Sequence, residues 1–218
     1  MSEQRRIAVL CSGGLDSCVL LADLATQADV YPIYVQFGLA WEAQELAAQQ
    51  AFVAAVRTPR VHGVTVLQTP VAPMYGEHWS VTGRGVPGAD TEDSAVFLPG
   101  RNILMLGAAA VWCSTHSVHE IAIGSLGANP FPDASPAFFA DFGRVLSTGL
   151  GHAVQVIAPY RGLHKEDIIR KHAGLPLELS LTCMAPRNGV HCGACNKCHE
   201  RRVAFAAAGV PDRTRYAT

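Results

Sequence analysis

A short glycine-containing loop near the start of the chain constrains the fold most strongly. Positions 12–17 read Ser-Gly-Gly-Leu-Asp-Ser, directly after the apolar run 7–11 and directly before the apolar run 18–21. Two adjacent glycines let the backbone turn sharply and bring several N–H groups onto one concave surface. A helix that starts there presents its positive N-terminal end at the same point. The pattern predicts a strand, a phosphate-binding loop and a helix.

This loop is not one of the commoner nucleotide motifs. No Gly-Lys-Ser or Gly-Lys-Thr occurs in the chain, which excludes a Walker-type phosphate loop. Its glycines are adjacent, so the loop also fails the Gly-x-Gly-x-x-Gly pattern of dinucleotide-binding folds. The remaining interpretations are a different class of phosphate loop or a plain turn with serine caps.

Strand-like and helix-like segments alternate along the chain. We expect strands at 7–11, 30–36, 61–68, 120–124 and 154–158, and helices at 16–28, 41–56, 103–116, 136–149, 165–172 and 199–208. This alternation predicts an α/β fold with a doubly wound parallel sheet. Ligands in such folds bind at the carboxyl ends of the strands, where the glycine loop lies. Segments 70–99 and 124–136 are rich in Gly, Pro and Asp, and we interpret them as substrate-side loops, one of them a lid.

The composition favours a compact enzyme that acts on a small molecule. The 218 residues suffice for one domain with a small appendage, and the net charge is only −1. No basic run exceeds two residues, so we expect no direct contact with nucleic acid. The longest apolar run, 103–113, is too short to span a membrane, and no signal peptide is visible. We therefore expect a cytoplasmic protein with no membrane partner.

Four of the seven cysteines lie close together near the C-terminus. Cys183 is followed after eight residues by Cys192, Cys195 and Cys198, which are separated by two-residue gaps. This spacing can supply a tetrahedral four-thiolate site. Zinc is the first interpretation and an iron–sulfur cluster the alternative, and a neighbouring histidine could replace one sulfur. We expect a structural metal that attaches the C-terminal segment to the main domain.

Three charged residues are candidates for contacts with phosphate. Arg101 lies near the predicted start of an apolar helix, where its guanidinium could meet phosphate or carboxylate oxygens. Lys165 opens a later helix and could reach the β and γ phosphates from the strand ends. Asp16 lies beside the glycine loop, where a carboxylate is a plausible magnesium ligand. Each could instead be an ordinary helix-start or solvated residue.

The hexapeptide at 12–17 resembles the Ser-Gly-Gly-x-Asp-Ser signature of the PP-loop ATP pyrophosphatases. These enzymes cleave ATP between the α and β phosphates and activate a substrate as its adenylate. Segments 97–104 (FLPGRNIL), 159–168 and 181–201 extend the match over nearly the whole chain. Together they resemble the 7-cyano-7-deazaguanine synthase family within that superfamily.

The resemblance implies a set of site residues and cofactors. Lys165 and Arg101 would be catalytic phosphate contacts beside Asp16, which would also bind Mg²⁺. Zn²⁺ would be held by Cys183, Cys192, Cys195 and Cys198. ATP would be held by Cys11, Ser12, Gly13, Gly14, Leu15, Asp16 and Ser17. The implied reaction adenylates 7-carboxy-7-deazaguanine and converts it with ammonia to the 7-cyano compound, a precursor of queuosine in transfer RNA.

Two segments depart from the family pattern on the substrate side. Positions 38–41 read Gly-Leu-Ala-Trp where the family usually carries Gly-Gln-Arg/Lys-His. Positions 130–135 read Pro-Phe-Pro-Asp-Ala-Ser, so that only Asp133 keeps the acidic residue of the family's Gly-Tyr-Pro-Asp-Cys-Arg segment. Asp133 is therefore a substrate-side candidate. The altered segments leave a relative that adenylates a different carboxylate as an alternative.

The resemblance also bears on organisation and partners. We expect a PP-loop domain over residues 1–180, a four-cysteine metal segment over 181–218 packed on it, and a homodimer. A transfer-RNA-modifying ATP pyrophosphatase is a further alternative, which the neutral charge disfavours. A non-catalytic nucleotide-binding protein should lack one of Ser12, Asp16 or Lys165, and all three are present.

Overall fold

The computed structural model describes residues 4–127 and 129–217, which form an α/β fold. In chain order the elements are β1 (Arg6–Leu10), α1 (Leu15–Leu24), β2 (Asp29–Gln36), α2 (Glu42–Ala55), β3 (Thr65–Gln68), α3 (Ala72–Tyr75), α4 (Trp79–Thr82), η1 (Asp93–Val96), α5 (Arg101–His116), β4 (Glu120–Ile123), η2 (Pro132–Ala134), α6 (Pro136–Leu150), β5 (Gln155–Ile157), α7 (Lys165–Lys171), η3 (Leu177–Leu179) and α8 (Asn196–Ala208).

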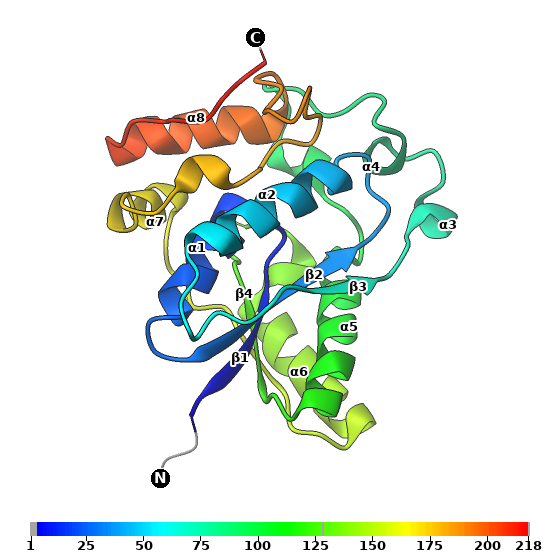
Figure 1. The fold of residues 1–218 in the computed structure, drawn as a ribbon. Helices are drawn as coiled ribbons and strands as arrows, with labels where there is room; N and C mark the ends of the chain where they lie inside the picture. The colour runs from blue at the N-terminus through cyan, green and yellow to red at the C-terminus, as the bar shows by residue number, and fades with distance from the viewer. Residues whose placement is uncertain (1–3, 128, 218) are drawn as a thin grey trace.

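The five strands form one parallel sheet, as the alternating pattern predicted. Their order is β3-β2-β1-β4-β5, so β1 lies in the centre. The chain leaves β1 in one direction through β2 to β3 and later returns to the other side through β4 and β5, which is the doubly wound arrangement. The start of β1 and helix α8 lie at opposite ends of the molecule (Figure 1). The carboxyl ends of β1, β2 and β4 therefore face the end that carries α8.

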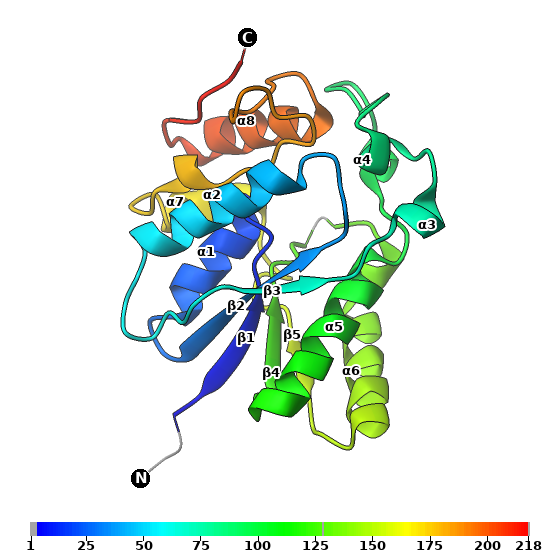
Figure 2. The same ribbon diagram turned by 45° about the vertical axis from the view of Figure 1, so that its right-hand side comes forward.

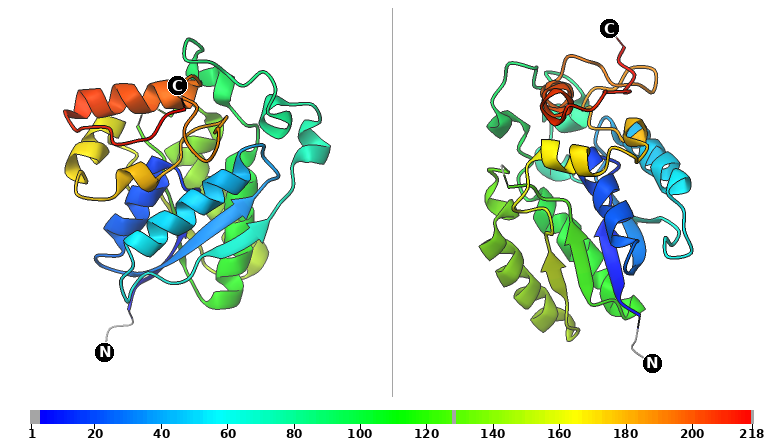
Figure 3. Two further views of the ribbon diagram at one scale, coloured as in Figure 1. Left: turned by 45° about the horizontal axis from the view of Figure 1, so that its top comes forward. Right: turned by 90° about the vertical axis from the view of Figure 1, so that its left-hand side faces the viewer.

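Helices cover both faces of the sheet, because successive side chains of each strand point to opposite sides. In β1, Ile7 and Val9 pack with residues of α1, α2, α7 and α8, whereas Ala8 and Leu10 pack with residues of α5 and α6. The two layers are visible on either side of the strands (Figure 3). A parallel sheet covered on both faces is buried throughout, in agreement with the apolar runs in the sequence.

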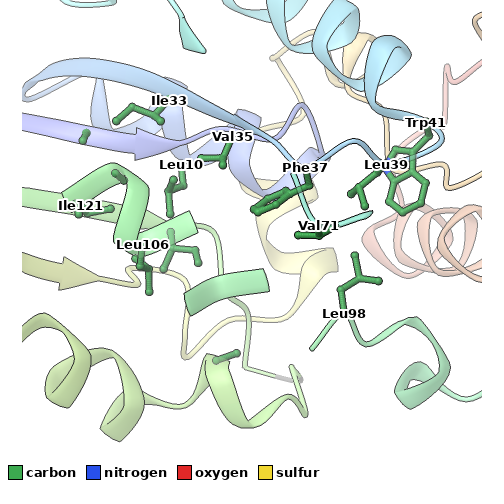
Figure 4. Packing of buried hydrophobic residues seen from close by; sticks show 14 of the residues in the cluster. Leu10, Ile33, Val35, Phe37, Leu39, Trp41, Val71, Leu98, Leu106 and Ile121 are labelled. Carbon is green, nitrogen blue, oxygen red and sulfur yellow. The ribbon is translucent and has the colours of Figure 1, made fainter. Parts of the chain in front are cut away.

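One of the two core clusters extends beyond the ends of the strands. From Leu10 and Ile33 it continues through Phe37, Leu39 and Trp41, all of which are buried (Figure 4). The four clustered cysteines belong to this same cluster of buried side chains. The C-terminal segment thus shares its apolar core with the sheet.

Segment 70–99 differs from the loop that its composition suggested. It contains the short helices α3 and α4 and the 3₁₀ turn η1, which lie beyond the strand ends (Figure 2). The start of α4 is capped by the side chain of His78, which accepts a hydrogen bond from the N–H of Ser80. Helices of four residues show no hydrophobic periodicity, so the sequence pattern could not reveal them. Segment 124–136 likewise contains η2.

Several predicted element boundaries were wrong. The strand expected over 61–68 begins only at Thr65, and Val61 makes a single isolated bridge to Val30. Helix α8 begins at Asn196, not at position 199, because Cys195 already adopts the extended conformation of an N-cap residue. Cys198 therefore lies inside the first turn of this helix. The helix expected over 16–28 ends at Leu24.

Candidate nucleotide and metal sites

The glycine loop turns directly from the end of β1 into α1. Gly13 has φ +83°, a left-handed conformation that favours glycine. A Cβ atom at Gly13 would lie 2.5 Å from the carbonyl oxygen of Glu45 and 3.2 Å from Cβ of Gln49, both in α2. The Ser17 hydroxyl donates to the carbonyl of Gly14 at 3.0 Å and lies 3.4 Å from the Ser12 hydroxyl. Glycine is required here both by the backbone conformation and by the close approach of α2.

The substitution Gly13→Ala should lower the free energy of unfolding by about 2–4 kcal/mol, because strain and a backbone clash add together. A matched control is Gly151→Ala, since Gly151 also has a positive φ, +59°, but a Cβ there would meet nothing within 4 Å. The Gly151→Ala substitution should lower the free energy of unfolding by only about 1 kcal/mol. Urea denaturation of both variants measures the difference, and equal losses would show that the contact with α2 is not tight.

A largely buried lysine, Lys165, with its side chain 12% exposed, reaches the start of α1 from α7. The Nζ atom of Lys165 lies 3.3 Å from Oδ2 of Asp16 and 2.6 Å from Oε1 of Glu200. Burial alone would lower the pKa of Lys165, but the two carboxylates outweigh burial and raise it. Lys165 is therefore a fixed positive charge beside the glycine loop. The structure brings Lys165 and Asp16 together at the strand ends, where a phosphate group would bring its negative charge.

Sequence reasoning missed Glu200. Its other carboxylate oxygen lies 2.7 Å from Nζ of Lys197, so it joins two lysines. Burial opposes ionisation of Glu200, but the lysines more than offset this and lower its pKa to about 2. The spacing of Lys197 and Glu200 along one helix was the available signal. The ion pair between Glu200 and Lys165, however, joins α8 to α7, so it depends on tertiary packing and could not be read from the sequence.

Asp16 retains an unused ligand atom. Among residues 4–127 and 129–217 its buried Oδ1 has no hydrogen-bond partner, while Oδ2 faces Lys165. Burial raises the pKa of Asp16, and the positive charge of Lys165 opposes that effect. A buried carboxylate oxygen next to a phosphate loop suits a hard divalent cation, which takes oxygen ligands. The residues present therefore fit a magnesium ion at this point.

Arg101 and Asp133 lie together at the start of α5. The carboxylate of Asp133 accepts a hydrogen bond from the backbone N–H of Asn102 at 3.2 Å, and the Asn102 side chain donates to the carbonyl of Asp133 at 3.0 Å. The guanidinium carbon of Arg101 lies 5.8 Å from the ring centroid of Phe37, just beyond β2. The buried Nε of Arg101 has no hydrogen-bond partner in the described part of the chain. Burial raises the pKa of Asp133, opposed by the Asn102 hydrogen bonds and by Arg101. A positively charged side chain, Arg101, and an acidic side chain, Asp133, thus lie together at the start of α5.

The altered segment 38–41 lies directly after β2. The N–H of Gly38 donates to Oε2 of Glu42 at 3.1 Å, which fixes the turn into α2. Trp41 precedes α2, and its ring stacks on Trp79 of α4 at 5.7 Å with an interplanar angle of 13°. In place of the polar residues that the resemblance implies, this chain therefore has an aromatic contact between the buried Trp41 and the partly buried Trp79 of α4.

The four clustered cysteines lie close enough together to hold one metal ion. Their sulfur atoms all lie within 4.8 Å of one another, and all four residues are buried. Bonds of about 2.3 Å in a tetrahedron place thiolate sulfurs about 3.8 Å apart. Cys192 and Cys198 lie 3.9 Å apart and Cys183 and Cys195 lie 4.0 Å apart, in agreement with that geometry. In a multi-iron cluster the four thiolates are divided among different irons, so such a cluster would spread the sulfurs further.

Backbone N–H groups support the cysteine sulfurs. The Cys183 sulfur accepts from the N–H groups of Ala185 and Cys192, at 3.3 and 3.2 Å. The Cys192 sulfur accepts from Ala194 and Cys195, at 3.4 and 3.3 Å. Such bonds favour the thiolate form that binds metal. His191 does not replace a sulfur, because its Nε2 accepts a hydrogen bond from the N–H of Thr182 at 3.2 Å.

The metal segment contacts the glycine loop. The N–H of Leu181 donates to the carbonyl of Gly13 at 2.8 Å. Helix α8, which begins within the cysteine cluster, supplies Glu200 to Lys165. The two candidate sites are thus joined through backbone and side chains.

Within residues 4–127 and 129–217, no helix combines the length and the apolar character needed to cross a membrane.

The family model described as "Queuosine biosynthesis protein QueC" matches residues 6–209. Among curated relatives, the 7-cyano-7-deazaguanine synthase of Methanothrix thermoacetophila is 32% identical over 97% of this chain and 98% of its own length. The synthases of an Azoarcus species and of Pseudomonas fluorescens are 31% and 30% identical, over 99% and 98% of this chain and 99% of their own lengths.

Among solved structures, a predicted subunit of tRNA methyltransferase from Methanocaldococcus jannaschii shares 15% identity at a TM-score of 0.46, over 81% of this chain and 92% of its own. That similarity is too low to bear on function. The family match and the synthases, by contrast, extend over nearly the full chain, including the glycine loop and the cysteine cluster. This chain therefore belongs to the QueC family of queuosine biosynthesis proteins.

Proposed function

We propose that this chain is an ATP-dependent carbon–nitrogen ligase that converts 7-carboxy-7-deazaguanine and ammonia to 7-cyano-7-deazaguanine, a step toward queuosine. The observation that carries the proposal is similarity to synthases of that name over their whole length. The glycine loop with Asp16 and Lys165 at the strand ends supports it, because this arrangement suits a polyphosphate.

The chemistry explains why ATP is needed. A carboxylate is a poor electrophile, and transfer of AMP to its oxygen gives a mixed anhydride with release of pyrophosphate. Attack by ammonia then expels AMP and leaves the amide. A second transfer of AMP to the amide oxygen lets that oxygen depart with AMP, so that loss of two protons from nitrogen gives the nitrile. The protein must mainly position the reactants and stabilise charge.

Different residues would bind the phosphates, the metal ions and the acid substrate, according to where they lie. The N–H groups of the glycine loop and the hydroxyls of Ser12 and Ser17 would bind phosphate oxygens, and Lys165 would stabilise the negative charge that develops on pyrophosphate. Asp16 would hold Mg²⁺, which neutralises phosphate charge when bound. Arg101 would contact a phosphate or the substrate carboxylate, and Asp133 would accept a hydrogen bond from the deazaguanine. The four cysteines would hold Zn²⁺ as a structural ion.

A direct assay tests the proposal. Purified protein is incubated with ATP, magnesium, ammonium and 7-carboxy-7-deazaguanine, and pyrophosphate and product are followed by mass spectrometry. We expect pyrophosphate and the nitrile, both dependent on the acid. Pyrophosphate without nitrile when other acids are supplied would favour the second candidate, a relative that forms an amide from a different carboxylate. The aromatic contact that replaces polar family residues at 38–41 is the observation behind that candidate.

We further propose the organisation and setting of this enzyme. Residues 1–180 would form the nucleotide-binding domain and residues 181–218 the metal segment packed on it. The protein would act as a cytoplasmic homodimer on small molecules, without direct contact with nucleic acid.

A further inference from the structure

Residues 79–98, which we term the strap, cross between the metal segment and the strand ends. One end of the strap is held at the altered segment, where the N–H of Ala40 donates to the carbonyl of Ser80 at 2.9 Å and Trp41 stacks on Trp79. The other end runs through η1 to the residues that precede Arg101. In the ribbon the strap passes close to the start of α8 (Figures 1 and 2).

The strap is attached to the cysteine cluster at one residue in particular. Asn196 follows the metal-ligand candidate Cys195 directly, and it is only 4% exposed. Its backbone N–H donates to the carbonyl of Pro87 at 3.0 Å, and its side-chain amide donates to the carbonyl of Thr91 at 2.9 Å. Cys195 and Gly88 add an isolated antiparallel bridge beside these bonds. A single buried asparagine thus joins two points of the strap to the site that would hold the metal.

The contacts of the strap lie on the side of the molecule that carries the sequence departures. Trp79 covers Trp41 of segment 38–41, and Phe97 at the far end packs on Phe131 at 4.9 Å, in the loop that leads to Asp133. Among the described residues, Asn196 makes no hydrogen bond to either of those loops, whereas it donates to two residues of the strap. The hydrogen bonds of Asn196 therefore connect it to those loops by way of the strap.

We propose that Asn196 is a positioning residue that holds the strap, and through it segments 38–41 and 130–135, in place for the acid substrate. The inference rests on the proposed function, because it assigns these loops to recognition of the acid and the glycine loop to ATP. Asn196 contributes to acid binding and not to ATP binding. A bound metal would strengthen the effect, since it would fix Cys195 next to Asn196 in the chain.

The test uses the full-length, zinc-loaded protein with the substitutions Asn196→Asp and Asn196→Ala. The aspartate has the same shape but turns a carboxylate oxygen, in place of an N–H, toward the carbonyl of Thr91. The alanine removes the side-chain bond without repulsion and serves if the aspartate variant does not fold. The matched control is Arg202→Ala, because Arg202 donates to the carbonyl of Gly193 within the metal segment at 3.0 Å and makes no hydrogen bond to the strap among the described residues.

Three measurements decide the inference. We expect amide hydrogen exchange in residues 84–98 to rise by about fivefold or more, as the loss of one buried hydrogen bond implies. The KM for the acid should rise by about tenfold while the KM for ATP stays within about twofold. Zinc content should not change, and the control should behave as wild type in all three.

Two results would overturn the inference. Unchanged exchange in the strap would show that Asn196 does not hold it, and equal shifts of both KM values would show no selective role in acid binding. The exchange measurement needs no substrate, so it can fail while the proposed reaction stands. Failure of the wild-type protein to form nitrile would instead count against the proposed function.

Discussion

Replacement of Asp16 by asparagine is expected to lower the rate of ATP cleavage by about 10³-fold while leaving the fold intact. The substitution removes the negative charge that faces Lys165 and the oxygen that is free to hold a cation. Lys165 retains its partner Glu200 at 2.6 Å, so no buried charge is left alone. Pyrophosphate release under saturating ATP measures the effect.

The same substitution has an opposite effect on stability. Burial raises the pKa of folded Asp16 above its ordinary value of 3.8, so the wild-type protein loses stability as the pH rises through that range. Asparagine carries no charge, and the variant should unfold at the same or a higher temperature at pH 7. This advantage should shrink as the pH falls and should vanish only well below 3.8, where Asp16 is protonated in the unfolded state as well.

The control for this pair of results is Asp23→Asn. Asp23 lies in the same helix, accepts a hydrogen bond from Tyr160 at 3.1 Å and takes no part in the glycine loop. Its loss should reduce stability slightly and leave ATP cleavage unchanged. Full activity in the Asp16 variant would remove the role that we propose for this carboxylate.

Substitution of Cys198 by serine should release the metal and lower the unfolding temperature by about 10 °C or more. Cys198 is fully buried in the first turn of α8, so loss of its thiolate leaves three ligands and an incomplete tetrahedron. The effect should extend beyond the segment, because the cysteines share a core cluster with the sheet. Metal analysis and thermal unfolding of the same sample test both parts.

Cys113→Ala is the matched control for the cysteine. Cys113 is also fully buried, but burial raises its pKa to about 12 and its thiol stays neutral. This variant should keep its metal and lose only about 1–2 kcal/mol of stability through lost packing. An iron signal in the wild-type protein, or equal thermal shifts in both variants, would contradict a structural zinc site.

The sequence predicted the sheet because its strands are buried on both faces. Runs such as residues 7–11 are apolar throughout, and helices alternate with them, so the parallel direction of the strands followed from general rules, whereas their order in the sheet comes from the structure. The predicted boundaries of helices and strands were wrong where tertiary contacts determine where an element begins. Val61 bridges to the sheet without continuing as a strand, and α8 starts three residues early at an extended cysteine.

The candidate site was predictable where one short motif contains the geometry. The glycine loop and the cysteine spacing each bring their groups together within a few residues. Glu200 and Asn196 could not be found in this way, because their partners Lys165 and Thr91 are 35 and 105 positions away in the chain. Neither residue type indicates its partner without the fold.

The apolar cluster that runs from the sheet past Trp41 to the cysteines has an evolutionary consequence. A C-terminal segment borrowed from a distant relative would bring foreign side chains against Leu39 and Trp41 and would lack a fitting surface for residues 79–98. Substitutions in the C-terminal segment and in the loop after β2 should therefore occur together during evolution. Recombination within the gene should leave these two segments inherited as a pair.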